Sequence, residues 1–280
     1  MLTWSSLDTL VATVSPDGRL TPKRMGSVRV VASAGRWRAD TARIAIVAPQ
    51  AALQFTDDWS ALDTLRWVPF GSPRPYVGDV RGRRALLVNG DSSFLSGVHE
   101  QARRRVGDGL AIHTAFSLPR SEAQWQVIVV SAAGVDSALL ARWDHRTDRE
   151  PGVSPDQCAV GLPHSEGYPG ATKFDVLGPG GEVHVFDARW MLDGRWVALD
   201  VQLFPDGTCG VALDGKPLVV TTNSIDPRTS VVVHLQGNSW RTTAAVGRTE
   251  IWTGVRPGID WSRLPARDGG TPRVARPAKP

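Results

Sequence analysis

The stretch that decides the fold is residues 182–255, which begins EVHVFDARWMLDGRWVALDVQLFPDGTCGVAL over residues 182–213. Apolar runs of strand length are separated here by Asp193-Gly194, Pro205-Asp206-Gly207 and Asp214-Gly215. An Asp-Gly pair tolerates a positive φ and therefore closes tight hairpins. Two more apolar runs follow, at residues 231–235 and 248–255. Strands at this even spacing predict an all-β fold of antiparallel hairpins, stacked as a sandwich or barrel.

The bulk composition fits an ordinary folded chain with many turns. The 280 residues are enough for one large β domain and a small one, and the 28 glycines and 20 prolines suit many short strands. The net charge of +4 is carried mostly by arginine, without a basic stripe interleaved with aromatics, so no nucleic-acid partner is expected. No apolar run is long enough for a transmembrane segment, and no signal peptide is visible at the N-terminus.

Residues 1–48 have the pattern of a small sandwich of their own. Trp4-Ser5-Ser6 is followed by a short strand at 11–14, an Asp17-Gly18 turn, and strands at 27–32 and 42–47. These residues resemble the C-terminal part of a bacterial Ig-like domain of group 2. The resemblance implies a partial sandwich with an open edge, because the first strands of that family have no counterpart here. We expect its core to contain Val14, Val28, Val30, Ile44 and Ile46.

Residues 49–256 form the larger domain, which begins after Pro49-Gln50. Strands are predicted at 85–88, 110–116 and 125–130, with a turn-rich link at 90–98 and loops at 141–181. Together with the hairpins above, this domain resembles a concanavalin A-like lectin/glucanase sandwich, the antiparallel jelly roll also used by laminin G-like modules. The resemblance implies a fold and carries no activity with it. We expect Val197, Leu199, Val211 and Leu213 in its core.

A candidate binding face follows from strand alternation. One face of 182–190 carries Glu182, His184 and Trp190, and one face of 196–204 carries Asp200 and Gln202. Aromatic rings beside carboxylate, amide and imidazole groups suit sugars, which offer C–H faces for stacking and hydroxyls for hydrogen bonds. The alternative is an ordinary solvated face.

No catalytic, cofactor or metal motif accompanies this face. Some glycosidases of this fold use a Glu-x-Asp-x-Glu strand, but none of the six glutamates has an acidic residue two positions later. The sequence lacks Gly-x-Ser-x-Gly, a phosphate loop, His-Glu-x-x-His and zinc-like Cys/His spacing. We therefore expect no enzyme, no cofactor and no metal.

The two cysteines and the C-terminal residues leave alternatives open. Cys158 and Cys209 either form one disulfide, in an oxidising compartment, or remain as two buried thiols. Residues 257–280 are rich in proline and arginine and cannot build a core, so we expect a free tail with Trp261, Arg263 and Leu264 as docking residues.

Three functions are compatible with these observations. The leading hypothesis is a non-catalytic extracytoplasmic module of a bacterial assembly, an accessory or scaffold subunit that docks on a partner protein or membrane complex. The second is a glycan-binding lectin or adhesin module, and the third is a glycoside hydrolase.

Overall fold

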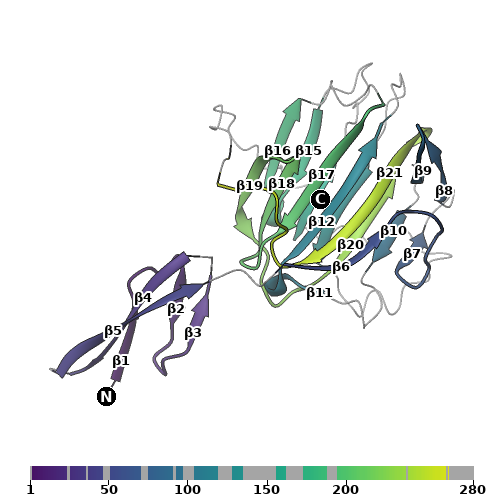
Figure 1. Ribbon diagram of the computed structural model, residues 1–280. Helices are drawn as coiled ribbons and strands as arrows, with labels where there is room; N and C mark the ends of the chain where they lie inside the picture. The colour runs from purple at the N-terminus through teal and green to yellow at the C-terminus, as the bar shows by residue number, and fades with distance from the viewer. Residues whose placement is uncertain are drawn as a thin grey trace, which may run out of the picture. The chain divides into compact units, whose positions relative to one another are not determined.

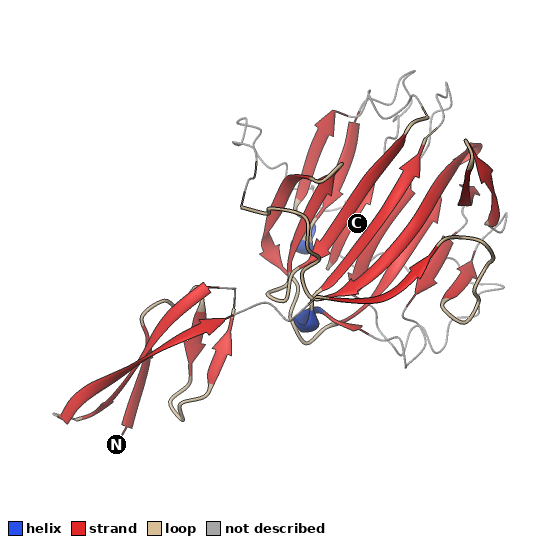
Figure 2. Ribbon diagram, in the orientation of Figure 1, coloured by secondary structure: helices blue, strands red, loops and turns tan. Residues whose placement is uncertain are grey.

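A computed structural model describes residues 2–23, 26–35, 37–46, 51–70, 75–90, 93–96, 104–118, 128–134, 156–161, 173–187, 194–237, 239–262 and 264 (Figure 1). The chain divides into two compact units, Met1–Gln50 and Ala51–Pro280. Strands make up nearly all the regular structure of the described residues, with two short 3-10 turns at Val106–Asp108 and Pro179–Gly181 (Figure 2). None of the helices in this part of the chain has the length and apolar character to span a membrane.

The N-terminal unit is a three-stranded sheet with a small hairpin. The sheet has the order β1 (Leu2–Ser6), β4 (Gly26–Ala34), β5 (Trp37–Ile46), and β2 (Ala12–Val14) pairs with β3 (Leu20–Pro22). The core of the unit consists of Val11, Ala12, Val28 and Val30, with Val14, Leu20 and Ile44 packed against it. The predicted core is thus confirmed, except for Ile46, whose side chain lies outside the described residues.

One end of the inner face of this sheet is only partly covered, by the turn at Gly18 against the Trp4 ring. Trp4 is paired with Ala32 and therefore points to the same side as Val30, two residues along the strand. Leu2 and Trp4 are nevertheless 57% and 36% exposed. The predicted strands at 11–14, 27–32 and 42–47 correspond to β2, β4 and the second half of β5, whereas β1 and β3 were not predicted as strands. The Ig-like character of the unit remains a resemblance.

The larger unit contains two eight-stranded antiparallel sheets. Sheet I has the order β16-β15-β14-β13-β20-β10-β7, with β11 also paired to β20. Sheet II has the order β19-β18-β17-β12-β21-β9-β8, with β6 also paired to β21. This is the predicted all-β antiparallel sandwich.

The bounds of the strands are as follows. Sheet I contains β7 (Trp67–Phe70), β10 (Ser93–Ser96), β11 (Arg104–Arg105), β13 (Ile128–Gly134), β14 (Gln157–Gly161), β15 (Lys173–Leu177), β16 (Val183–Asp187) and β20 (Ser230–Gly237). Sheet II contains β6 (Ala52–Asp57), β8 (Tyr76–Val80), β9 (Arg83–Gly90), β12 (Leu110–Ser117), β17 (Trp196–Leu203), β18 (Thr208–Leu213), β19 (Lys216–Ser224) and β21 (Ser239–Thr253).

Two of the three predicted turns, Asp206-Gly207 and Asp214-Gly215, close consecutive hairpins in sheet II. Gly207, between β17 and β18, has a φ of 86°, and its N–H donates to the carbonyl of Phe204. Asp214 and Gly215, between β18 and β19, both have positive φ, as expected for a two-residue hairpin turn. Alternate residues of these strands face the core, which confirms the prediction for Val197, Leu199, Val211 and Leu213.

Two predicted loops contain strands instead. The link at 90–98 includes β10, and the region 141–181 includes β14 and β15. These strands are only four or five residues long, and the turn residues around them conceal their pattern. Tertiary context forms them, because β14 lies between β13 and β15 and buries Val160 in the core. The predicted strand at 125–130 begins at Ile128 among the described residues.

A disulfide bond joins the two sheets inside the core. Cys158 lies on β14 of sheet I and Cys209 on β18 of sheet II, with 5.4 Å between their Cα atoms. Both residues are fully buried. Of the two alternatives, the structure has the bonded form.

The first residues of the predicted free tail pack on the sandwich. The Trp261 ring meets the Phe204 ring edge to face, with 5.4 Å between the ring centroids. A Cβ on Gly210 would lie 2.8 Å from Trp261, so the glycine provides the space for the indole. Trp261 is therefore used within its own domain, which corrects the expectation that nothing after Pro257 packs. Leu264 is 42% exposed, and Arg263 lies outside the described residues.

Candidate functional site

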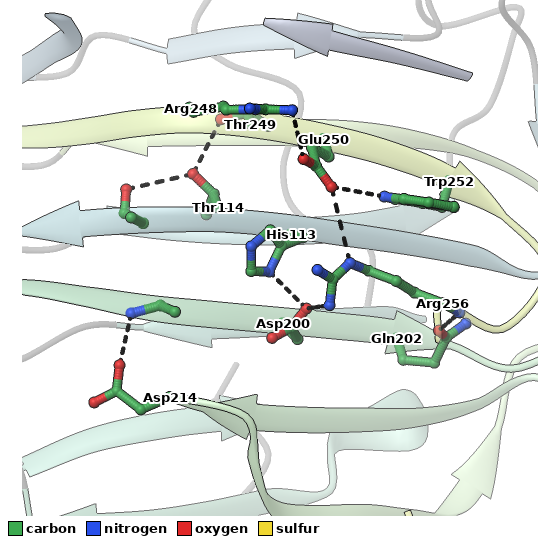
Figure 3. A network of polar contacts seen from close by, with 12 residues as sticks. His113, Thr114, Asp200, Gln202, Asp214, Arg248, Thr249, Glu250, Trp252 and Arg256 are labelled. Atoms are coloured by element: carbon green, nitrogen blue, oxygen red, sulfur yellow. Dashed lines mark hydrogen bonds and ion pairs between the residues drawn. The ribbon is translucent and has the colours of Figure 1, made fainter. Parts of the chain in front are cut away.

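The candidate site is a polar network on the face of sheet II that is turned away from sheet I. On β17 the side chains of Val197, Leu199 and Val201 fill the core, so Asp200 points to the opposite face. The register places His113 of β12 beside Asp200, and Glu250 of β21 on the other side of His113. Three adjacent strands therefore bring an acid, an imidazole and a second acid into one row (Figure 3).

Asp200 is held by two hydrogen-bond donors. Its Oδ1 lies 2.8 Å from Nδ1 of His113 and 2.9 Å from Nη1 of Arg256. The Asp200 side chain is only 6% exposed, while those of His113 and Arg256 are 28% and 21% exposed. The arrangement is a partly buried ion pair whose cationic and imidazole groups reach the surface.

Glu250 is held by a matching set of donors on the other side of Arg256. Nη2 of Arg248 lies 3.0 Å from Oε1, and the indole N–H of Trp252 donates to Oε2 at 3.1 Å. Nε of Arg256 is 4.0 Å from the same Oε2. Arg256 thus lies between the two carboxylates, with its guanidinium 6.0 Å from the centre of the Trp252 ring (Figure 3).

Gln202 is buried and supports this network through hydrogen bonds to the backbone. Its Nε2 donates to the carbonyls of Leu110 and Gly254, and its Oε1 accepts the backbone N–H of Arg256 at 3.0 Å. The residue is 1% exposed. Gln202 therefore fixes the backbone that follows β21, and with it the position of the Arg256 side chain.

A second indole lies on the same face. A Cβ on Gly247 would come within 3.0 Å of the Trp196 ring and 3.4 Å of the Ala115 carbonyl, so Trp196 lies over a floor of small residues. The Arg83 guanidinium is 5.5 Å from the centre of the Trp196 ring. Two tryptophans thus accompany the network, both partly exposed.

Several polar atoms of the network have no partner among the described residues. Oδ2 of Asp200, Nε2 of His113 and Nη2 of Arg256 take part in none of the hydrogen bonds around them. The set contains an acceptor, a donor and an imidazole nitrogen that can serve as either. It can therefore bind a group that both donates and accepts hydrogen bonds, such as a hydroxyl.

The structure separates the residues that the sequence placed on one candidate face. Asp200 and Gln202 lie on sheet II, but Glu182 and His184 lie at the outer edge of sheet I. Asp193-Gly194 is the reason: the sequence indicated a hairpin there, whereas β16 and β17 belong to different sheets. Trp190 lies outside the described residues.

Glu182 and His184 form an edge contact between the sheets. The Glu182 carboxylate accepts the backbone N–H groups of Thr222 and Asn223 on β19, at 2.9 and 3.0 Å, and lies 2.7 Å from Nε2 of His184. Burial raises the pKa of Glu182, but the hydrogen bonds from Asn223, His184 and Thr222 outweigh burial, and the pKa falls below its usual 4.5. The Glu182 carboxylate therefore has a structural role, in which it links the two sheets.

His113, Glu250, Trp252 and Arg256 were not singled out from the sequence. The signal was present for three of them: His113, Glu250 and Trp252 each stand next to a buried isoleucine, Ile112 or Ile251, on a strand and so point to the opposite face. Arg256 gives no such signal, because it follows the strand and its position depends on Gln202.

Comparison with known proteins shows that the fold is similar to those of several solved structures. No protein-family model matches the chain, and no curated protein matches it in sequence. Among solved structures, a family 16 glycoside hydrolase endo-glucanase from Bacteroides ovatus aligns with a TM-score of 0.48 and 9% identity over 70% of this chain and 99% of that chain. Lectin I-B4 from Griffonia simplicifolia gives 0.46 and 11% over 72% and 99%, and peanut lectin gives 0.46 and 8% over 74% and 99%. These neighbours are jelly-roll sandwiches.

Proposed function

We propose that the larger unit is a non-catalytic carbohydrate-binding module, and that the outward face of sheet II is its binding surface. The observation that carries this proposal is the row of Asp200, His113 and Glu250, held in place by Arg256 beside the Trp252 indole. The row lies on three neighbouring strands, so the sheet itself keeps its spacing constant.

The chemistry of the row suits sugar hydroxyls. A pair of neighbouring sugar hydroxyls donates and accepts hydrogen bonds at the same time, and the free atoms of Asp200, His113 and Arg256 offer both kinds of partner. The C–H face of a sugar ring stacks on an indole, and Trp252 and Trp196 provide indoles on this face. Because the polar side chains already hold one another, little side-chain freedom is lost on binding.

Binding is favoured over hydrolysis because both carboxylates are already held by donors of the protein itself. A glycosidase needs one carboxyl group free to deliver a proton and another free to act as a base or nucleophile. Here Asp200 accepts from Arg256, and Glu250 accepts from Arg248 and Trp252. We expect no release of reducing sugar from any polysaccharide that binds.

The test is binding to a panel of immobilised polysaccharides, followed by titration calorimetry with the oligosaccharides that bind. Trp252→Ala and Asp200→Asn should each weaken binding about tenfold or more, because each removes a stacking or charge-assisted contact of ~1.4 kcal/mol or above. Arg228→Ala is the control, since Arg228 is 90% exposed on a turn. Circular dichroism checks that each variant folds. Absence of binding across the panel, or unchanged affinity in both variants, would contradict the proposal.

A second candidate is docking of the N-terminal unit on a partner protein. Its support is the exposed inner face at Leu2 and Trp4. An extracytoplasmic location fits both candidates, because a buried disulfide forms in an oxidising compartment. Trp4→Ser should release the protein from its partner in co-purification from native material. An unchanged complex in this variant would leave the docking candidate without support.

A further inference from the structure

A second feature of the larger unit is a buried arginine on the core side of sheet I. Arg104, on the short strand β11, is paired with Val231 of β20, which is a core residue. Arg104 therefore points between the two sheets, and it is only 8% exposed. Its guanidinium lies 5.7 Å from the centre of the Phe55 ring on β6, at the end of the sandwich where β6 and β11 lie close together (Figure 1).

The Arg104 guanidinium has no anionic partner among the described residues. None of the ion pairs in that part of the chain includes Arg104, and its Nη1 is buried without a hydrogen bond. The acids next to Phe55 and Arg66 are engaged elsewhere: Asp57, on the strand of Phe55, accepts from the N–H groups of Trp59 and Trp67, and Asp63 pairs with Arg66 at 3.1 Å. The positive charge of Arg104 is therefore not balanced by any carboxylate in the described part of the chain.

A buried charge without a counter-ion is thermodynamically unfavourable. Moving a cation out of water costs several kcal/mol, and a neighbouring anion usually offsets that cost. Burial alone lowers the pKa of Arg104, with no opposing contribution from a carboxylate. The Phe55 ring offers the guanidinium a cation–π contact, but a neutral ring balances no charge.

We infer that Arg104 is the binding group for the carboxylate of a small organic acid. A guanidinium binds a carboxylate through two parallel N–H···O bonds, and Nη1 of Arg104, which is buried without a hydrogen bond, can provide one of them together with a neighbouring N–H. One monovalent carboxylate would balance the charge of Arg104, because Arg66, whose guanidinium also lies over the Phe55 ring, already pairs with Asp63. This site faces the core, so it is independent of the outward glycan face.

The test is thermal unfolding of the full chain at constant ionic strength, with chloride exchanged for acetate, for benzoate or for phosphate. A carboxylate at roughly ten times its Kd should raise the Tm of the wild-type protein by about 3 °C in a saturable way. Arg104→Met should lose this rise completely. In chloride alone it should be at least as stable as the wild type, because a buried charge has been removed. Arg105→Met is the matched control, since Arg105 is the exposed neighbour on the same strand and should keep the rise.

A second variant keeps the experiment informative if Arg104→Met does not fold. Arg104→Lys keeps the charge but not the fork of donors, so it should fold and bind the carboxylate about tenfold more weakly. No saturable rise with either carboxylate, or an equal rise in Arg104→Met, would overturn the inference. A larger rise with phosphate that depends on Arg104 would overturn the assignment of the ligand as a carboxylate.

Discussion

Replacing Glu182 with alanine should loosen one side of the sandwich. Glu182 directly precedes β16, the edge strand of sheet I, and its carboxylate accepts three hydrogen bonds from Thr222 and Asn223 on β19, the edge strand of sheet II. His184 holds the other carboxylate oxygen at 2.7 Å. The side chain therefore joins the edge strands of the two sheets.

The size of the effect follows from these bonds. Hydrogen bonds to an ionised group contribute about 1.5–3 kcal/mol each, but Thr222 and Asn223 are exposed, and water replaces part of what is lost. The Glu182 side chain is 7% exposed, so solvent screening is limited. Glu182→Ala should lower the free energy of unfolding by about 2–4 kcal/mol. Glu182→Gln keeps one acceptor oxygen and should cost about 1–2 kcal/mol.

Urea unfolding of the two variants and the wild type measures these differences. Asp79→Asn is the control, because Asp79 forms an exposed ion pair with Arg84 and should contribute about 0–1 kcal/mol. The lowered pKa of Glu182 adds a pH signature: its contribution is complete above pH 4.5 and is lost as the pH falls through the folded-state value. A loss below about 0.5 kcal/mol in Glu182→Ala at neutral pH would refute the reasoning.

Three further perturbations test other parts of the sandwich. Replacing both Cys158 and Cys209 with alanine should lower the free energy of unfolding by about 4 kcal/mol on the chain-entropy model for a separation of 51 residues, as measured by urea unfolding. Gly207→Ala should unfold the domain or lower its Tm by more than 10 °C, roughly, because the new Cβ would lie 1.9 Å from the carbonyl oxygen of Ile225; normal thermal unfolding would disprove this. Burial raises the pKa of Asp57, so the stability of the wild type relative to Asp57→Asn should decrease as the pH rises above 3.8, and a difference independent of pH would contradict the buried carboxyl.

The parts of the fold that depend on local chemistry could be predicted from the sequence. Asp-Gly and Pro-Asp-Gly need positive φ and so mark hairpins, and alternation identified Val197, Leu199, Val211 and Leu213 as core residues. Strand β14 escaped prediction because its stability comes from the neighbouring strands rather than from its own pattern. A short strand between turn residues has too few positions to establish a period.

The candidate site shows the same division between local and long-range information. Alternation predicts correctly that Glu182 and Asp200 point away from the apolar side chains of their own strands, but it does not say to which sheet each strand belongs. That choice depends on β16 pairing with β15 and on β17 pairing with β12, contacts far apart in sequence. Arg256 depends on a contact with Gln202 across 54 residues, which no local pattern encodes.

The buried disulfide also sets an order of events for the chain. Both sulfur atoms lie inside the closed sandwich, where neither an oxidant nor a reducing thiol can approach them. The bond therefore has to form while the two sheets are still apart. A chain that closes with free thiols keeps them sealed until the domain opens again. The redox conditions during folding therefore determine whether the folded protein contains the disulfide. Later changes in redox conditions do not alter it unless the domain unfolds.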